Sequence, residues 1–110
     1  MAENISCQTD NELRESFISL CDWIAEADDR LRIFVPGTHS QIQVLEQIDQ
    51  LLARFPDLEQ RPPMFGVPVG VKDIFHCDGF ITRCGSDLPP ELFQGPEAGV
   101  VARLKAAGAI

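Results

Sequence analysis

The residues best placed to do chemistry lie in the segment 63–73, which reads PMFGVPVGVKD. This segment puts Lys72 at the end of an apolar, alternating run, where a charge is costly. Taking an ammonium group partly out of water favours its neutral form, and a neutral amine can accept a proton. The only other lysine, Lys105, does not lie in a hydrophobic segment. We therefore interpret Lys72 as a candidate general base.

Two other residues, Ser86 and Asp73, suggest partners for Lys72. Ser86 suggests a Lys72–Ser86 dyad, because serine–lysine nucleophile pairs exist. The dipeptide Gly85-Ser86 also suits a turn that lines a site, and we prefer this interpretation. Asp73 could form an ion pair with Lys72, but neighbours on a strand face opposite ways. A hydrogen bond from the Asp73 side chain to the loop backbone is the expectation we favour.

The histidines and cysteines give weaker signals. His39 and His76 have no aligned acid or nucleophile, so we expect them to be surface or loop residues. Thr82 is expected to hydrogen-bond within its loop. Cys77 and Cys84 could be combined with His76 as metal ligands, but a second ligand pair is absent, so we expect no metal and no cofactor. The cysteines lack Cys-x-x-Cys spacing, which predicts free thiols at Cys7, Cys21, Cys77 and Cys84.

Composition limits the classes of function. The chain has 110 residues, about one small domain, and a formal net charge of -8. Such a charge repels phosphate backbones and argues against nucleic-acid binding. No apolar run approaches the roughly 18 residues that cross a bilayer, which argues against a membrane protein. Residues 1–6 lack the basic start and apolar core of a secretory signal, so a cytoplasmic location is expected.

Three helices are predicted from apolar spacing and capping signals. Thr9 and Glu12 form a capping-box pattern that begins a helix over about 10–32. The run Thr38-His39-Ser40-Gln41 repeats the capping signal and predicts a second helix, which ends before Pro56. A third is predicted over about 97–107, with Gly108 as its C-terminal cap. Trp23 is interpreted as a core or helix-interface anchor.

The segment 67–72 is predicted to be a strand. Its valines point to one face, and Pro68, Gly70 and Lys72 point to the other. Because Pro68 is constrained by its ring and Gly70 has no side chain, they leave open space in front of Lys72. Residues 73–96 are rich in glycine and proline and are typical of a long loop. Residues 109–110 read as the first step of another strand. Because helices and a single strand would leave apolar faces without partners, we expect a fragment that can self-associate.

Three blocks of this sequence, 65–73, 79–86 and 100–109, resemble the N-terminal part of the amidase signature family. The family shows the order hGVPhhVKD, then G, T..GS, and VV..L..AGA, and the match extends over residues 63–110. The resemblance implies an α/β fold class, here an incomplete N-terminal portion of the amidase signature fold, with two N-terminal helices and then a strand-loop-helix of a mixed sheet. Residues 1–110 would be a partial amidase domain, with a helical region over 1–60 and the start of the α/β core over 61–110.

The function implied by the resemblance is hydrolysis of amide carbon–nitrogen bonds by a Ser–Ser–Lys triad. One serine attacks the carbonyl, a second relays protons and the lysine is the base; only the lysine maps here, onto Lys72. The family's Gly/Ser-rich segment would lie beyond residue 110, and none of the serines present stands in such a run: Ser6, Ser16, Ser19, Ser40 and Ser86. We expect a small-molecule amide as substrate of the complete protein, with unknown binding residues, and no activity from this chain alone.

Two other functions remain open. The chain could be a truncated, non-catalytic paralogue that acts as an interaction module through its uncovered helices and strand. It could also represent the RNA-linked amidotransferase subunit of the same family, which the acidic charge does not support.

Overall fold

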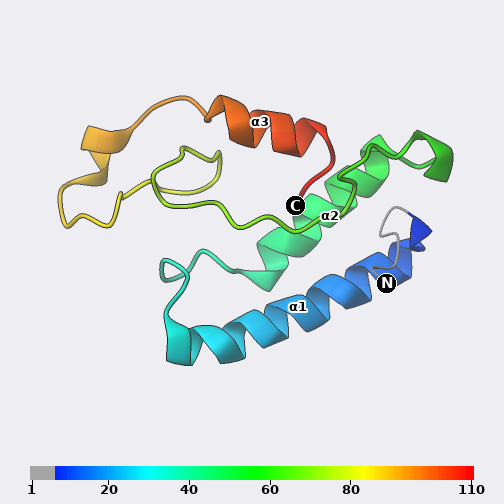
Figure 1. The fold of residues 1–110 in the computed structure, drawn as a ribbon, viewed down its shortest axis with the longest axis horizontal. Helices are drawn as coiled ribbons and strands as arrows, with labels where there is room; N and C mark the ends of the chain where they lie inside the picture. Colours follow the sequence, from blue (N-terminus) through cyan, green and yellow to red (C-terminus); the bar gives the residue numbers. More distant parts are fainter. Residues whose placement is uncertain (1–6) are drawn as a thin grey trace.

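Helices dominate the part of the chain that the structure describes. A computed structural model describes residues 7–110; residues 1–6, which include Ser6 and the stretch judged to lack a signal, lie outside it. The α-helices are α1 (Asp10–Leu31), α2 (Gln41–Arg54) and α3 (Gly99–Ala106), and short 3-10 turns form η2 (Leu58–Gln60) and η3 (Pro90–Phe93). In Figure 1, α1 and α2 form a hairpin, and α3 lies on the other side of α2 from α1. No helix within 7–110 is long and apolar enough to cross a membrane.

The two ends of α1 are defined by short-range hydrogen bonds. Thr9 Oγ1 accepts the Glu12 N–H at 3.3 Å, and the Glu12 carboxylate accepts the Thr9 N–H at 2.7 Å. This is the predicted capping box, and it satisfies two backbone donors that would otherwise lack partners. At the other end, the Asp28 carboxylate accepts the N–H groups of Ile33 and Phe34 at 2.6 and 2.9 Å. The predicted first helix is confirmed to within one residue.

The other two helices also follow the predicted spacing. Ser40 is the N-cap of α2, and its hydroxyl accepts the Gln43 N–H at 3.5 Å. The third helix is shorter than expected, because its first residue is Gly99 rather than Glu97. Gly108 follows α3 with φ +96, a left-handed conformation in which a side chain would be strained.

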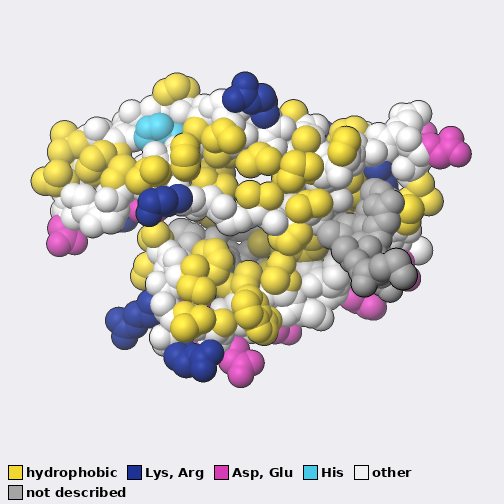
Figure 2. Space-filling view, viewed as in Figure 1, with side chains coloured by type: hydrophobic (Ala, Val, Ile, Leu, Met, Phe, Trp, Pro, Cys, Tyr) yellow, Lys and Arg dark blue, Asp and Glu magenta, His cyan; other side chains and the backbone are white. Residues whose placement is uncertain are grey.

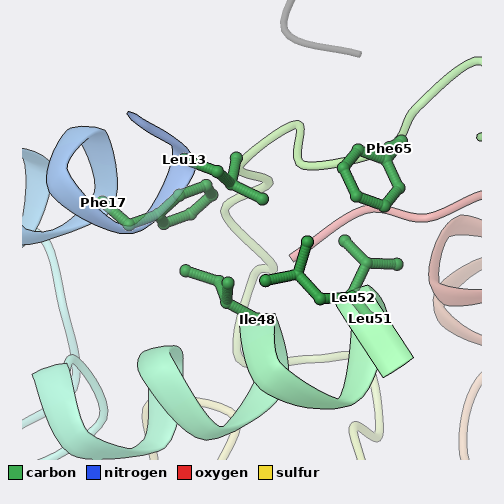
Figure 3. Close-up of a cluster of buried hydrophobic side chains, with 6 residues drawn as sticks. All are labelled: Leu13, Phe17, Ile48, Leu51, Leu52 and Phe65. Carbon is green, nitrogen blue, oxygen red and sulfur yellow. The ribbon is translucent and has the colours of Figure 1, made fainter. Parts of the chain in front are cut away.

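The hydrophobic core joins the helical hairpin to residues 61–66, which we call the connector. Leu13 and Phe17 of α1 face Ile48, Leu51 and Leu52 of α2, and Phe65 closes the cluster from the connector, as Figure 3 shows. Trp23 is 62% exposed, so its prediction as a core anchor is wrong. Successive helical residues are separated by about 100°, which places Trp23 about 200° from the buried Cys21. Trp23 therefore lies outside the buried stripe of α1.

The Arg61 side chain binds the connector to the start of α1. Its side chain is only 2% exposed and forms an ion pair with Asp10 at 2.9 Å. A second guanidinium nitrogen donates to the Gln8 carbonyl at 2.8 Å, and the plane lies 4.2 Å from the centre of the Phe65 ring. A planar guanidinium with several fixed donors can make all of these contacts at once, which a lysine could not.

The connector also holds the C-terminal end of α3. The Met64 N–H donates to Ala107 O at 3.2 Å, and the Gly66 N–H donates to Gly108 O at 2.9 Å. A Cβ on Gly108 would lie 2.8 Å from the Cα of Phe65, closer than real Cβ contacts. The absence of a side chain at Gly108 is therefore what lets the two segments meet.

The predicted strand over 67–72, and with it the strand-loop-helix of a mixed sheet, is wrong for this structure, because residues 7–110 contain no strand. The backbone of this segment pairs with a distant segment through only two bonds: Val69 N–H to Ile110 O at 2.8 Å and Ile110 N–H to Val67 O at 3.0 Å. A strand needs a longer ladder with a neighbour. The alternation of residue types specified an extended segment but did not supply that neighbour.

Candidate active site

Lys72 lies where the extended segment ends and the chain turns. Its carbonyl accepts the N–H groups of Ile74 and Phe75 at 2.8 and 3.1 Å. The side chain is exposed, and within residues 7–110 no hydrogen bond or ion pair engages its amine. The expected partial removal from water is therefore not observed. Val71 and Phe75 are themselves exposed and give the lysine little apolar cover.

The Asp73 side chain is directed at the backbone of a later loop segment. One carboxylate oxygen accepts the Arg83 N–H at 3.0 Å, and the other accepts the Gly85 N–H at 3.4 Å. The Asp73 carbonyl accepts the N–H of Cys84, between them, at 3.0 Å. The expected loop-shaping hydrogen bond is confirmed. We call this set of three bonds the Asp73 clamp.

The clamped segment 83–86 is a tight turn. Cys84 and Gly85 have φ +53 and φ +65, and the Ser86 N–H donates to the Arg83 carbonyl at 3.0 Å. Two successive left-handed residues are the pattern of a type I′ turn. The conformation costs the cysteine roughly 1–2 kcal/mol, which the surrounding bonds must offset.

Ser86 behaves as a turn residue. Its hydroxyl oxygen accepts the Leu88 N–H at 3.0 Å. No hydrogen bond joins it to Lys72 in the described part of the chain, so the two do not form a dyad here. The preferred interpretation of Gly85-Ser86 as a turn is confirmed by the turn geometry.

His76 braces the rest of the loop. Its Nδ1 lies 3.0 Å from Oγ1 of Thr82, which is only 9% exposed. The His76 carbonyl accepts the N–H of Ala98, the N-cap of α3, at 2.9 Å. A Cβ on Gly95 would lie 2.9 Å from His76 Nε2, so a residue without a side chain suits that position. The expected hydrogen bond of Thr82 within the loop is confirmed.

Neither the histidines nor the cysteines assemble a metal site in the described part of the chain. No group of three or more His, Cys, Asp or Glu side chains there could hold an ion. Cys7, Cys21, Cys77 and Cys84 are all free.

A charged cluster around Lys105 was missed from the sequence. The Glu97 carboxylate accepts a hydrogen bond from Lys105 Nζ at 2.5 Å and another from the Asp78 N–H at 2.8 Å. The Glu97 side chain is 15% exposed and that of Lys105 is 40% exposed. Glu97 precedes α3 and Lys105 lies in its last turn, so no helical spacing indicates this pair in the sequence. No local pattern connects either residue with Asp78.

The cluster shifts the titration of its members in opposite directions. The hydrogen bonds from Lys105 and the Asp78 N–H lower the pKa of Glu97. Partial burial alone would lower the pKa of Lys105, but the Glu97 hydrogen bond and nearby negative groups outweigh it and raise that pKa. Burial raises the pKa of the Cys77 thiol, and the Lys105 charge opposes this only in part.

Lys105 also borders a groove of about 300 Å³. The groove lies between α2, residues 77–80 and the end of the chain, and its wall from α2 is mostly polar, with one apolar residue: Gln43, Glu46, Gln47, Gln50, Leu51 and Arg54. Lys72 does not line this groove, so this groove and the predicted base are separate.

Acid should weaken the attachment of α3 to the loop through Glu97. Because the folded-state pKa of Glu97 is lowered, its contribution to the free energy of unfolding is present above its unfolded pKa and is lost as pH falls through the folded value. Because the folded-state pKa of Lys105 is raised, its contribution is lost instead as pH rises through that value. We expect Glu97→Gln to reduce the loss of stability between neutral pH and pH ~3.

Urea unfolding at a series of pH values would measure this effect. Glu91→Gln, at an exposed position in η3, is the matched control and should keep the wild-type acid dependence. An identical pH dependence in wild type and Glu97→Gln would contradict the proposed origin of the shift.

Comparison with known proteins identifies the family. The amidase family model matches residues 15–110. A glutamyl-tRNA(Gln) amidotransferase subunit from Exiguobacterium sibiricum is 31% identical over 98 residues, which cover 89% of this chain and 18% of that protein. The protein of the same name from Geobacillus thermodenitrificans is 32% identical over 88 residues, covering 79% of this chain and 18% of that protein. The chain belongs to the amidase family.

The match has a limited extent within these relatives. The chain spans less than a fifth of their length. A more similar stretch, 46% identical over 46 residues, is shared with the protein of the same name from Thiobacillus denitrificans and covers 42% of this chain and 10% of that protein. No solved structure matches the chain significantly.

Proposed function

We propose that this chain is the N-terminal part of an amidase-type hydrolase of amide carbon–nitrogen bonds, in which Lys72 is the general base. The observation that carries the proposal is the amidase match over residues 15–110, which includes the GVPVGVKD segment ending in Lys72 and Asp73. Within residues 7–110 no ion pair engages the Lys72 amine, which leaves it available to other partners; removal from water, which would favour its neutral form, would have to come from parts of the complete protein that pack over it. The substrate of the complete protein would be a small-molecule amide.

In this mechanism the attacking serine passes its proton to the second serine as its oxygen bonds to the amide carbonyl, and the second serine passes its own proton to Lys72. The proton then passes back to the departing amine, which leaves as a neutral molecule while its acyl group stays on the serine as an ester. Water, deprotonated through the same relay, then attacks this ester, which releases the carboxylic acid and restores the serine. Three of the four described serines have hydroxyls bonded to the backbone, and the fourth, Ser19, is an exposed residue of α1 without a hydrogen bond to Lys72. Ser16 donates its hydroxyl to the Leu13 carbonyl at 2.8 Å, and the hydroxyl oxygens of Ser40 and Ser86 accept backbone N–H groups. We therefore propose that both triad serines belong to sequence that this chain does not contain.

Assays of two proteins test the proposal. Residues 1–110 alone should release no ammonia from simple amides above background, whereas the product of the reading frame extended past Ile110 should do so. The extension should encode a Gly/Ser-rich run within a few dozen residues. Hydrolysis by residues 1–110 alone would contradict the assignment of the serines.

The names of the relatives favour a more specific form of this function. They are called glutamyl-tRNA(Gln) amidotransferase subunits, which suggests that the complete protein is a component of such an enzyme. The same extended protein would separate the two forms. A free-standing amidase would hydrolyse amides without other subunits, whereas an amidotransferase component would form glutaminyl-tRNA from glutamyl-tRNA(Gln) when its partners are present.

Exposed apolar side chains favour one different function, the interaction module. Figure 2 shows apolar groups gathered over the loop and α3. The exposed large residues from 71 onward are Val71, Ile74, Phe75, Phe80, Ile81, Leu88, Leu92 and Val100. Surfaces of this kind bind other chains. A stop codon directly after Ile110 would favour this function over the amidase.

A further inference from the structure

The carboxylate of Asp73, the residue after Lys72, binds distant backbone N–H groups and not the lysine. Asp73 is the next residue, yet its two oxygens accept N–H groups from Arg83 and Gly85, ten and twelve residues away. Its carbonyl accepts the intervening Cys84 N–H. Three consecutive backbone donors therefore end on one residue, immediately after the lysine.

This arrangement bears on the lysine in two ways. The clamp fixes the backbone on the C-terminal side of Lys72, where the chain already turns through bonds from Ile74 and Phe75 to the Lys72 carbonyl. It also directs the negative charge of Asp73 toward backbone donors. Charge-assisted hydrogen bonds of this kind are about twice as strong as neutral ones, so they compete with pairing to the neighbouring ammonium.

We infer that Asp73 is a positioning residue for Lys72: its clamp on residues 83–85 sets the direction of the lysine and leaves the amine free of an ion pair. The inference rests on the proposed function, in which Lys72 is the general base. Asp73 is half-buried in the loop and is not part of the core cluster. Loss of its carboxylate should therefore affect the lysine far more than the global fold.

The clamp can be tested without any activity. In Asp73→Asn, the side-chain amide has one accepting oxygen, and its NH₂ group faces a backbone donor. Amide hydrogen exchange on residues 1–110 should then become at least about tenfold faster at Arg83 and Gly85, with little change at the core residue Ile48. Asp87→Asn makes the same chemical change at an exposed acid just after the turn and should leave exchange at Arg83 and Gly85 unchanged. Unchanged exchange in Asp73→Asn would overturn the clamp.

The positioning role needs kinetics on the complete protein. Asp73→Asn should lower kcat by about tenfold or more while KM changes by less than about twofold, because the interaction lost acts on the reacting group and not on substrate binding. Asp87→Asn should keep both constants.

Parallel measurement of Lys72→Ala separates the two possible failures. If Lys72→Ala abolishes turnover and Asp73→Asn keeps kcat, the positioning role is overturned and the proposed function stands. If Lys72→Ala retains turnover, the proposed function fails. An equal loss of kcat and gain of KM in Asp73→Asn would indicate general disruption and would also overturn the inference.

Discussion

Replacing Lys72 by alanine should reduce amide hydrolysis by the complete protein about a thousandfold or more, because the serine hydroxyl would lose its proton acceptor. The loss should appear in kcat. A general base accepts the proton during the chemical step, so it stabilises the transition state and not the bound substrate. The KM should therefore change little. Ammonia release under saturating amide would measure the effect. Near-normal turnover in Lys72→Ala would remove the general-base assignment.

Two further lysine variants make the experiment specific. Lys72→Arg keeps the positive charge, but a guanidinium does not deprotonate in proteins, so this variant should also be inactive. Lys105→Arg provides the control, because arginine can keep the ion pair with Glu97 and this residue lies outside the proposed site. Its kcat should stay close to that of the wild type. Activity in Lys72→Arg would show that charge, rather than proton transfer, is what the position supplies.

Replacing Phe65 by alanine should destabilise the fold by about 3–5 kcal/mol, the usual cost of removing a buried phenylalanine. Phe65 is 1% exposed, and its ring meets Phe55 edge-on at 6.3 Å and lies beneath the Arg61 guanidinium. Small domains are stable by only about 5–15 kcal/mol, so this variant should be partly unfolded under mild conditions. Urea unfolding of residues 1–110, followed by circular dichroism, measures the loss.

Phe75→Ala is the matched control for Phe65→Ala. This phenylalanine is 42% exposed, and surface substitutions of this kind usually change stability by about 0.5 kcal/mol or less. Equal unfolding midpoints for the two variants would mean that Phe65 does not join the connector to the helical hairpin.

The helices were predictable because their signals are local. The Thr9 and Glu12 capping box and the apolar stripe that includes Leu13 and Phe17 lie within a few residues of each other, and each element carries its own evidence. The prediction for Trp23 is wrong because residue type alone does not fix the face of a helix, and Trp23 lies on the face of α1 away from the buried stripe. The strand over 67–72 failed for a different reason: a ladder depends on a distant partner segment, which periodicity does not report.

The site shows the same division. The backbone role of Asp73 followed from the tendency of aspartate to bind nearby N–H groups. The exposure of Lys72 did not follow, since a hydrophobic segment in sequence need not be covered in space. The Glu97 cluster also escaped prediction, because the loop that contains Asp78 meets α3 only in the folded chain. The catalytic role of Lys72 stays a prediction.

The contact at Gly108 links motions that would otherwise be independent. The backbone of Phe65 lies against Gly108. The residues before and after Phe65 bond to the end of α3: Met64 N–H to Ala107 O, and Gly66 N–H to Gly108 O. A tilt of α3 would therefore also move the segment that begins at Met64, because α3 and this segment can separate only if these bonds break. The position of α3 and the start of the segment that leads to Lys72 are thus set by the same few backbone bonds, and these bonds can form only because Gly108 has a hydrogen atom in place of a side chain.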